Sequence, residues 1–268
     1  QYTQSVISWK KINISEKNIY IPISPWFQEV LSYSLSLSSQ TSGYYDPTAG
    51  SLVNAWGFGP NKAIKRPSRK EIERLVQTVG YDKIVLEKNG VKKKNSRVYI
   101  DLSSVAKGFA VDHISKKFLL LGYKDTLVEI GGEIKAKGHK PGRNPWIVGI
   151  EKPNQNRSVQ VKLFLVDSSI ATSGDYRNFY KTNEGQFTHT INPKTGRSEA
   201  TNLLSVSVVS EECMHADAIA TALMAMGTKR AKNFIKKHNI SAYLIIRKGK
   251  YFETIASRNF KKLMSRKT

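Results

Sequence analysis

The sequence is poor in cysteine, in long apolar runs and in acidic residues. Its 268 residues include one cysteine, Cys213, so no disulfide can form within the chain. A structural zinc site built from several cysteines is excluded for the same reason. No apolar run approaches the roughly 18–20 residues that a membrane-spanning helix needs, so no such helix is expected. Cys213 precedes an apolar helical pattern, and we expect it to be a small buried residue.

The shortage of acidic residues leaves a large positive charge. There are 43 Lys and Arg against 21 Asp and Glu, a net charge of +22. This imbalance favours an acidic partner: nucleic acid, an anionic membrane surface or a phosphorylated ligand. No RNP-like strand, zinc finger or helix-turn-helix signature accompanies the charge, so nucleic acid is not expected. A solvated basic surface near a membrane is the favoured interpretation.

Apolar periodicity predicts the secondary structure. Helices are expected over residues 25–42, 68–80, 104–121, 213–226 and 229–238, the second of them opened by a capping box at Ser68. Strands are expected over residues 84–86, 98–100, 127–130, 146–150, 159–166, 203–209, 242–246 and 251–255. Residues 44–60 are expected to form an ordered loop. Because strands and helices are interspersed without regular βαβ alternation, the predicted fold class is α+β.

One candidate anion site lies where a strand is expected to end and a helix to begin, at residues 101–108. Free backbone N–H groups and the positive end of the helix dipole favour an anion there. Lys107 in the first helical turn is unfavourable for the dipole, which suggests a phosphate or carboxylate partner. The alternative is an ordinary serine-capped helix with a solvated lysine.

A candidate metal site is formed by Asp217 and Thr221, which lie at positions i and i+4 of one helix face. Hard oxygen ligands of this kind suit Mg²⁺, which usually keeps several waters and substrate phosphates. Burying such an acid among alanines would be costly without a partner. The alternative is a capping or surface aspartate, with the threonine bonded to its own backbone.

Two polar stretches, residues 172–178 and 188–196, lie close together in the sequence. His189 is expected to end a strand just before the turn at residues 192–196. A histidine there could move a proton near neutral pH, although a structural histidine is an equal alternative. Glu129 and Glu133 flank Gly131-Gly132; one could bind an outer-shell water, but strand-edge carboxylates are the safer interpretation.

Six stretches taken in order resemble the FAD:protein FMN transferases, the ApbE-like family. They cover most of the chain from about Ser5 onward, and their joint order is highly specific. They are residues 45–50 with 52–59, residues 80–83, residues 101–112, residues 128–133, residues 172–178 with 189–196, and residues 214–223.

The resemblance implies a single α+β flavin-transferase domain over residues 1–268, with mixed sheets and packed helices, that binds FAD with Mg²⁺ at the pyrophosphate. Asp217 and Thr221 would hold the metal through their side chains, and Ser104 through its backbone carbonyl. His189 matches the histidine that assists proton transfer. The positions that match the FAD pocket are Tyr44, Tyr45, Asp46, Asp101, Lys107 and Ile191.

The activity implied is Mg²⁺-dependent transfer of FMN from FAD to a Thr or Ser hydroxyl of an acceptor protein, with AMP leaving. The acceptor would belong to a membrane redox complex. The resemblance also implies a location in the periplasm or on the outer face of the cytoplasmic membrane, with a lipid anchor in the full-length form. Two alternatives remain open: an FAD pyrophosphatase giving FMN and AMP, and a non-catalytic flavin-binding protein.

Two departures from the family pattern bear on these expectations. The family's usual leader, its anchor cysteine and its first strand are not found in this sequence, because residues 5–8 already resemble a motif inside the family domain. Asn192 stands where the family usually has aspartate. This removes one carboxylate and argues against a second metal ion.

Overall fold

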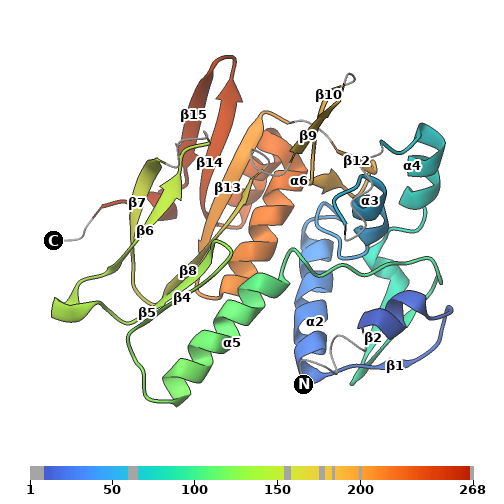
Figure 1. Cartoon of the computed structure of the whole chain (residues 1–268), viewed down its shortest axis with the longest axis horizontal. Coiled ribbons are helices and arrows are strands. Elements are labelled where there is room, and N and C mark those ends of the chain that lie inside the picture. The colour runs from blue at the N-terminus through green and yellow to red at the C-terminus, as the bar shows by residue number, and fades with distance from the viewer. Residues whose placement is uncertain are drawn as a thin grey trace. The chain divides into compact units, whose positions relative to one another are not determined.

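A computed structural model describes residues 9–59, 66–153, 158–174, 179–182, 185–198 and 201–265. The chain forms two compact units (Figure 1). Unit 1 comprises residues 1–103 and 181–199, and unit 2 comprises residues 104–180 and 200–268. The α+β class predicted from the sequence is confirmed, because helices accompany sheets whose described pairings are antiparallel. In the part of the chain described, no helix is long and apolar enough to span a bilayer.

Unit 1 is built around helix α2 (Pro25–Gln40) and a small sheet of order β1-β3-β2. The strands are β1 (Ile21–Pro22), β2 (Ile84–Glu87) and β3 (Gly90–Lys93). Its further elements are α3 (Gly50–Ala55), α4 (Arg69–Val76), the 3-10 turn η1 (Tyr81–Lys83), β10 (Gly185–Thr188), β11 (Ile191–Asn192) and β12 (Arg197–Ser198). The core of unit 1 packs Phe27 and Leu31 of α2 against the sheet residues Ile84 and Val91. Strand β9 (Phe179–Thr182) pairs with β10.

Unit 2 has a six-stranded sheet of order β15-β14-β13-β8-β5-β4. In chain order the strands are β4 (Thr126–Ile130), β5 (Glu133–Lys137), β8 (Ser168–Gly174), β13 (Leu203–Ser210), β14 (Ser241–Lys248) and β15 (Tyr251–Ala256). Helix α5 (Ala106–Leu120) packs on β4 and β5, and helix α6 (Cys213–Lys237) packs on β8 and β13. The hairpin of β6 (Trp146–Glu151) and β7 (Val159–Leu165) shares a second core with the sheet and with Phe260 of α7 (Arg258–Lys261). The short 3-10 turn η2 (Pro141–Arg143) precedes β6.

Several predicted elements are confirmed with small shifts at their ends. The Ser68 side chain accepts a hydrogen bond from the backbone N–H of Glu71, as the capping box requires, but α4 ends at Val76 rather than near Gly80. The two helices predicted over 213–226 and 229–238 are the two halves of α6. They meet at Gly227, whose φ of 68° and ψ of 170° are not helical. Cys213 is fully buried, as expected.

The strand pair predicted around Asn89-Gly90 is wrong in its second member. Residues 98–100 make only an isolated bridge, between Tyr99 and Ala49, and the partner of β2 is the lysine-rich β3. The expected solvation of the lysines fails at Lys93, whose side chain is fully buried. Its ammonium donates to the carbonyl oxygens of Asn13, Ser96 and Val98. Those bonds offset part of the cost of burying the charge, and an apolar pattern cannot reveal them.

Residues 44–60 hold a helix, α3, where the sequence suggested only a loop. Strands β1, β5, β8, β9, β11 and β12 were also missed, whereas the strand expected to end at His189 is β10, which ends at Thr188. Several of these are only two residues long, and β5 and β8 are rich in Lys, Ser and Thr. Their strand state depends on pairing with neighbours rather than on a local apolar pattern.

Candidate functional site

The first turns of α5 and α6 come together in unit 2. Gly108 of α5 allows this approach, because a Cβ at position 108 would lie 2.4 Å from the carbonyl oxygen of Cys213. Asp112, one turn further along α5, caps α6 by accepting hydrogen bonds from the backbone N–H groups of Cys213 (2.9 Å) and Met214 (2.8 Å). An acidic group is favourable at a helix N-terminus, where N–H groups lack intrahelical partners.

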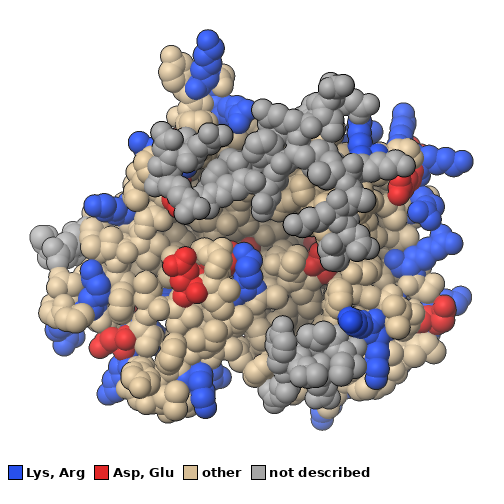
Figure 2. Space-filling model, in the orientation of Figure 1, with Lys and Arg blue, Asp and Glu red and all other residues tan. Residues whose placement is uncertain are grey.

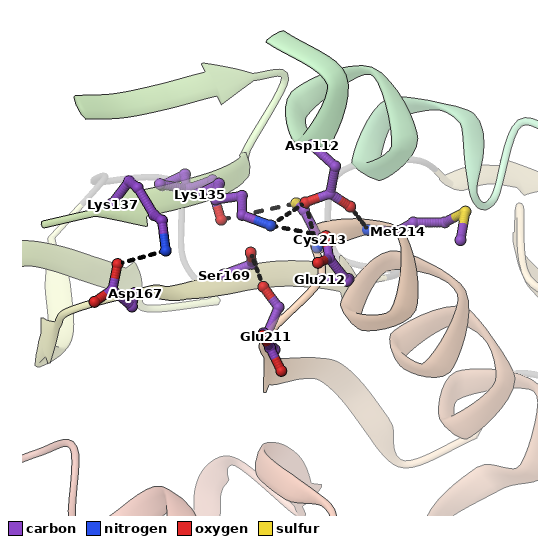
Figure 3. A network of polar contacts seen from close by, with 10 residues as sticks. Asp112, Lys135, Lys137, Asp167, Ser169, Glu211, Glu212, Cys213 and Met214 are labelled. Atoms are coloured by element: carbon purple, nitrogen blue, oxygen red, sulfur yellow. Dashed lines mark hydrogen bonds and ion pairs between the residues drawn. The ribbon is translucent and has the colours of Figure 1, made fainter. Parts of the chain in front are cut away.

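Lys135 of β5 completes this junction (Figure 3). Its ammonium lies 2.8 Å from a carboxylate oxygen of Asp112 and 2.8 Å from one of Glu212. Although burial opposes the charge, the hydrogen bonds that the ammonium donates to these two carboxylates raise the pKa of Lys135. The network fixes the start of α6 and therefore the position of Asp217 one turn later.

Asp217 is buried beside the start of α5. Its Oδ2 accepts a hydrogen bond of 3.1 Å from the backbone N–H of Gly108, the residue after Lys107. Burial, and next the negative charge of Glu133, raise the pKa of Asp217 to about 7. Asp217 is therefore neither a solvated surface acid nor the cap of α6, which are the alternatives left by its sequence.

The carboxylate of Glu133 pairs with Lys107, and its negative charge acts on Asp217. Its Oε1 forms an ion pair of 2.6 Å with the ammonium of Lys107, so the carboxylate partner suggested by the position of Lys107 is present. The Glu133 side chain is 2% exposed, and its Oε2 has no hydrogen-bond partner. Burial raises the pKa of Glu133, against the lowering effect of Lys107. The expectation of a simple strand-edge carboxylate is incomplete, because the side chain turns inward.

Thr221 lies one turn beyond Asp217 on the same helix, as its spacing predicted. Its hydroxyl is 3.1 Å from the hydroxyl of Ser173, which lies on the neighbouring strand β8. Ser104 is half-buried in the turn that precedes α5. The three predicted metal ligands thus belong to unit 2, on or near the facing starts of two packed helices.

The predicted flavin residues near the start of the chain lie in unit 1. Asp46 closes the loop before α3 by accepting from the backbone N–H and hydroxyl of Thr48 and from the N–H of Tyr81. Burial raises the pKa of Asp46 against these hydrogen bonds. The side chain of Tyr45 is buried, with its hydroxyl 3.3 Å from that of Ser34. These contacts assign Tyr45 and Asp46 a part in the architecture of the loop.

Tyr44 and Asp101 have polar partners in unit 1. The Lys194 ammonium lies 5.2 Å from the Tyr44 ring centroid. A carboxylate oxygen of Asp101 accepts a hydrogen bond from the backbone N–H of Ser103. The backbone N–H of Asp101 donates to the carbonyl oxygen of Pro47. Asp101 therefore organises the turn that leads to α5.

His189 follows β10, which ends one residue before it, at Thr188. Its ring is half-buried and meets the ring of Phe58 edge to face, with centroids 6.3 Å apart. Ile191 is buried in β11, and the side chain of Asn192 accepts from the N–H of Lys194 within the turn. Asn192 is therefore used in turn formation, as the sequence suggested.

The predicted site residues are divided between the units. Ser104, Lys107, Asp217 and Thr221 belong to unit 2; Tyr44, Tyr45, Asp46, Asp101, His189 and Ile191 belong to unit 1. Of the polar stretch at residues 172–178, the last four lie outside the described residues. The described residues contain no group of three or more His, Cys, Asp or Glu side chains placed to hold a metal ion. The predicted magnesium site has one carboxylate, one hydroxyl and one carbonyl, and it remains a prediction.

Sequence reasoning underrated Glu133 and missed Ser173 and Gly108. A signal for Glu133 was available in Lys107, whose unfavourable helix position called for an anionic partner. The roles of Ser173 and Gly108 depend on contacts with Thr221 and Asp217 of α6, which lie 48 and 109 positions away and which no local pattern reveals.

Comparison with known proteins gives a consistent result. Residues 3–244 match the ApbE family. The chain is 40% identical over 260 residues to an FAD:protein FMN transferase of Haemophilus influenzae, covering 94% of this chain and 75% of that protein. It is 37% identical over 239 residues to one of Vibrio cholerae, covering 88% and 72%.

Solved structures give the same answer. The flavin transferase ApbE of Vibrio cholerae superposes with a TM-score of 0.87 at 33% identity, covering 96% of this chain and 82% of that one. The apo form of the Pseudomonas stutzeri flavinyl transferase ApbE gives a TM-score of 0.88 at 30% identity, covering 97% and 81%. By sequence and by fold, the chain belongs to the ApbE family.

Proposed function

We propose that this protein transfers the FMN part of FAD to a Thr or Ser hydroxyl of an acceptor protein, in a reaction that depends on Mg²⁺. The relatives that match most of this chain share the name FAD:protein FMN transferase, and this name supports the proposed transfer. The single structural observation that carries the metal-dependent chemistry is the buried carboxylate of Asp217, held beside Lys107 and Glu133 at the start of α5.

The residues present fit a magnesium ion. Asp217 and Thr221 present hard oxygen atoms from one helix face, and Ser104 can add its backbone carbonyl. The cluster has two carboxylates, those of Asp217 and Glu133, and one ammonium, that of Lys107. A bound cation would therefore balance the excess negative charge. When bound, Mg²⁺ would offset the negative charge on the FAD pyrophosphate and on the departing phosphate.

The chain itself can bind and orient the pyrophosphate at the start of α5. The first turn of α5 has no side-chain cap, since Val105 stands at the N-cap position. Its N–H groups other than that of Gly108, which donates to Asp217, and the positive end of the helix dipole therefore favour an anion. Lys107 is about half exposed, with 47% of its side chain accessible, so its ammonium can contact a phosphate oxygen while paired with Glu133.

In the proposed reaction, the acceptor hydroxyl oxygen forms a bond to the FMN phosphorus while the bond from this phosphorus to the bridging oxygen breaks. AMP leaves with the bridging oxygen, and the hydroxyl proton passes to His189. The edge-to-face contact with Phe58 restricts the orientation of the imidazole. General-base catalysis of this kind typically contributes about 10²–10⁴-fold.

The experiment combines the protein, FAD, Mg²⁺ and a flavin-acceptor subunit, and follows covalent flavin fluorescence on a denaturing gel together with AMP release. We expect a labelled band with the wild-type protein and none with Asp217→Asn. AMP release without acceptor, at the rate seen with it, would support the pyrophosphatase instead. Unchanged transfer by Asp217→Asn would refute the role of the metal site.

We also propose that the acceptor belongs to a membrane redox complex and that the protein works in the periplasm or on the outer face of the cytoplasmic membrane. The basic surface is compatible with this placement. Figure 2 shows Lys and Arg side chains spread over the visible face rather than gathered in one patch. Fractionation of cells, with detection of the native protein, tests the location; recovery in the cytoplasm would overturn it.

A further inference from the structure

The buried oxygen Oε2 of Glu133 is without a partner. Among the buried side-chain atoms of the described residues that lack a hydrogen bond, it is the one that belongs to a charged group; the others are hydroxyl oxygens. Leaving a carboxylate oxygen buried and unsatisfied is costly, so such an atom needs an explanation.

The surroundings of Glu133 supply part of the explanation for this unpartnered oxygen. The Lys107 ammonium forms an ion pair of 2.6 Å with Oε1. The carboxylate of Asp217 also interacts electrostatically with both Glu133 and Lys107. One ammonium thus faces two carboxylates. Beside them the β4–β5 turn has no side chains, because it consists of Gly131 and Gly132, both with positive φ. A Cβ at Gly132 would meet nothing within 4 Å, and one at Gly131 would meet only Oε2 and Lys107 Cδ, each at 3.6 Å.

We infer that Glu133 is a positioning residue of the proposed cation site: Oε1 holds Lys107, and Oε2 accepts a hydrogen bond from a water molecule bound to the cation. This inference rests on the proposed function, since it assumes a divalent ion at Asp217 and Thr221. Mg²⁺ commonly retains several waters, and carboxylates that receive such hydrogen bonds orient the metal-bound groups.

The test is Mn²⁺ binding to the FAD-free chain, followed by electron paramagnetic resonance. Outer-shell substitutions typically weaken metal binding about 10–100-fold, so Glu133→Gln is expected to raise the dissociation constant by that factor. The matched control is Asp167→Asn, which changes the carboxylate of another short ion pair of unit 2, the one of 2.8 Å with Lys137. It should leave the affinity unchanged.

A second variant tests the sign of the effect. Lys107→Gln removes the positive charge and frees Oε1, so Mn²⁺ should bind at least as tightly as in the wild type. It also serves if Glu133→Gln fails to fold. Wild-type affinity in Glu133→Gln, or weaker binding in Lys107→Gln, would overturn the inference. If the wild-type chain binds no Mn²⁺, the proposed metal site itself fails, which is a different result.

A separate observation concerns the C-terminal end of α5. The apolar side chains of Phe118, Leu119, Leu120, Leu121 and Tyr123, which we call the α5 patch, are all exposed; Leu120 is 74% exposed. Contiguous exposed apolar surface usually marks an interaction site. Helix α5 packs on β4, the edge strand of the sheet (Figure 1).

The charges around the α5 patch indicate its partner. Lys116, Lys117 and Lys124 flank the patch and are exposed. The neighbouring acid, Asp125, accepts a hydrogen bond from the N–H of His139. Leucines and aromatic rings beside lysines match the interface of an anionic bilayer, where apolar groups insert and cations meet headgroups. We propose that the α5 patch binds the surface of an anionic membrane.

Cosedimentation with phosphatidylglycerol–phosphatidylcholine vesicles tests this proposal. We expect the wild-type chain to bind these vesicles and to bind pure phosphatidylcholine much more weakly. The double change Leu120→Ser and Leu121→Ser should reduce binding at least about tenfold. Each leucine that moves from water into the bilayer contributes substantially to the free energy of binding. The control Tyr251→Ser alters an equally exposed side chain on β15 and should bind as the wild type does.

Three outcomes would overturn the membrane proposal. They are absence of wild-type binding, full binding by the leucine variant, and a drop in the sedimenting mass of the lipid-free protein caused by the leucine change. The last would show that the patch joins two copies of the chain.

Discussion

The carboxylate of Asp217 on α6 accepts a hydrogen bond of 3.1 Å from the backbone N–H of Gly108 on α5. This contact joins the two sequence motifs that were candidates for metal and phosphate binding. It holds the acid next to Lys107 and makes the geometry of the proposed site depend on the packing of two helices.

Gly108→Ala should destabilise the protein and weaken Mn²⁺ binding. The added methyl group would lie 2.4 Å from the Cys213 carbonyl oxygen, and overpacking of this kind costs about 1–3 kcal/mol. Chemical denaturation measures the change. The control Ala106→Ser, at an exposed position in the same turn, should be close to neutral. Wild-type stability in Gly108→Ala would show that the helices can separate without cost.

Asp112→Ala should lower the free energy of unfolding by about 2–4 kcal/mol. The change removes the acceptor for two N–H groups of α6 and one partner of the half-buried Lys135. Asp112→Asn keeps one acceptor oxygen and should cost less. Equal losses for the two variants in urea denaturation would argue against a capping role.

His189→Asn should reduce transfer of FMN by about 10²–10⁴-fold while FAD still binds. The reason is that the imidazole is proposed to take the hydroxyl proton rather than to hold the flavin. Single-turnover labelling gives the rate, and quenching of FAD fluorescence gives the affinity. Loss of FAD binding in proportion to the rate would assign His189 to the binding of substrate instead.

Lys93→Met should destabilise unit 1 by about 2–4 kcal/mol at neutral pH, because three carbonyl oxygens lose a charged donor. Burial lowers the pKa of Lys93. The folded protein therefore releases this proton more readily than the unfolded chain, and wild-type stability gains from rising pH below the ordinary lysine pKa of about 10.4.

The pH dependence of the Lys93 effect is measured as a difference. The stability of the wild type minus that of Lys93→Met should increase as the pH rises toward the ordinary lysine pKa of about 10.4, because the folded lysine loses its proton before the unfolded one does. Lys94→Met, at an exposed neighbouring position, should show no such trend. A difference that falls as pH rises would contradict the assigned direction of the pKa shift.

Much of the fold could be predicted from the sequence where side chains act locally. The Ser68 cap, the apolar faces of α2 and α6, and the long apolar strand β13 are visible in short windows, and all are present. Strand β8 could not be predicted in this way. Its Ser and Thr residues form a strand because β5 and β13 pair with it on either side.

The candidate site shows the same division. The i and i+4 spacing of Asp217 and Thr221 put them on one helix face, which the structure confirms. The burial of Asp217, the inward turn of Glu133 and the close approach at Gly108 arise from contacts between segments far apart in the chain. Residue type alone cannot tell a solvated acid from one buried against a second carboxylate.

The most direct test of the central claim is anomalous diffraction from crystals of the protein soaked with Mn²⁺ and FAD. We predict a peak at bonding distance from both the Asp217 carboxylate and the Thr221 hydroxyl, facing the FAD pyrophosphate. A peak elsewhere, or bound FAD without any metal peak at these side chains, would contradict the account.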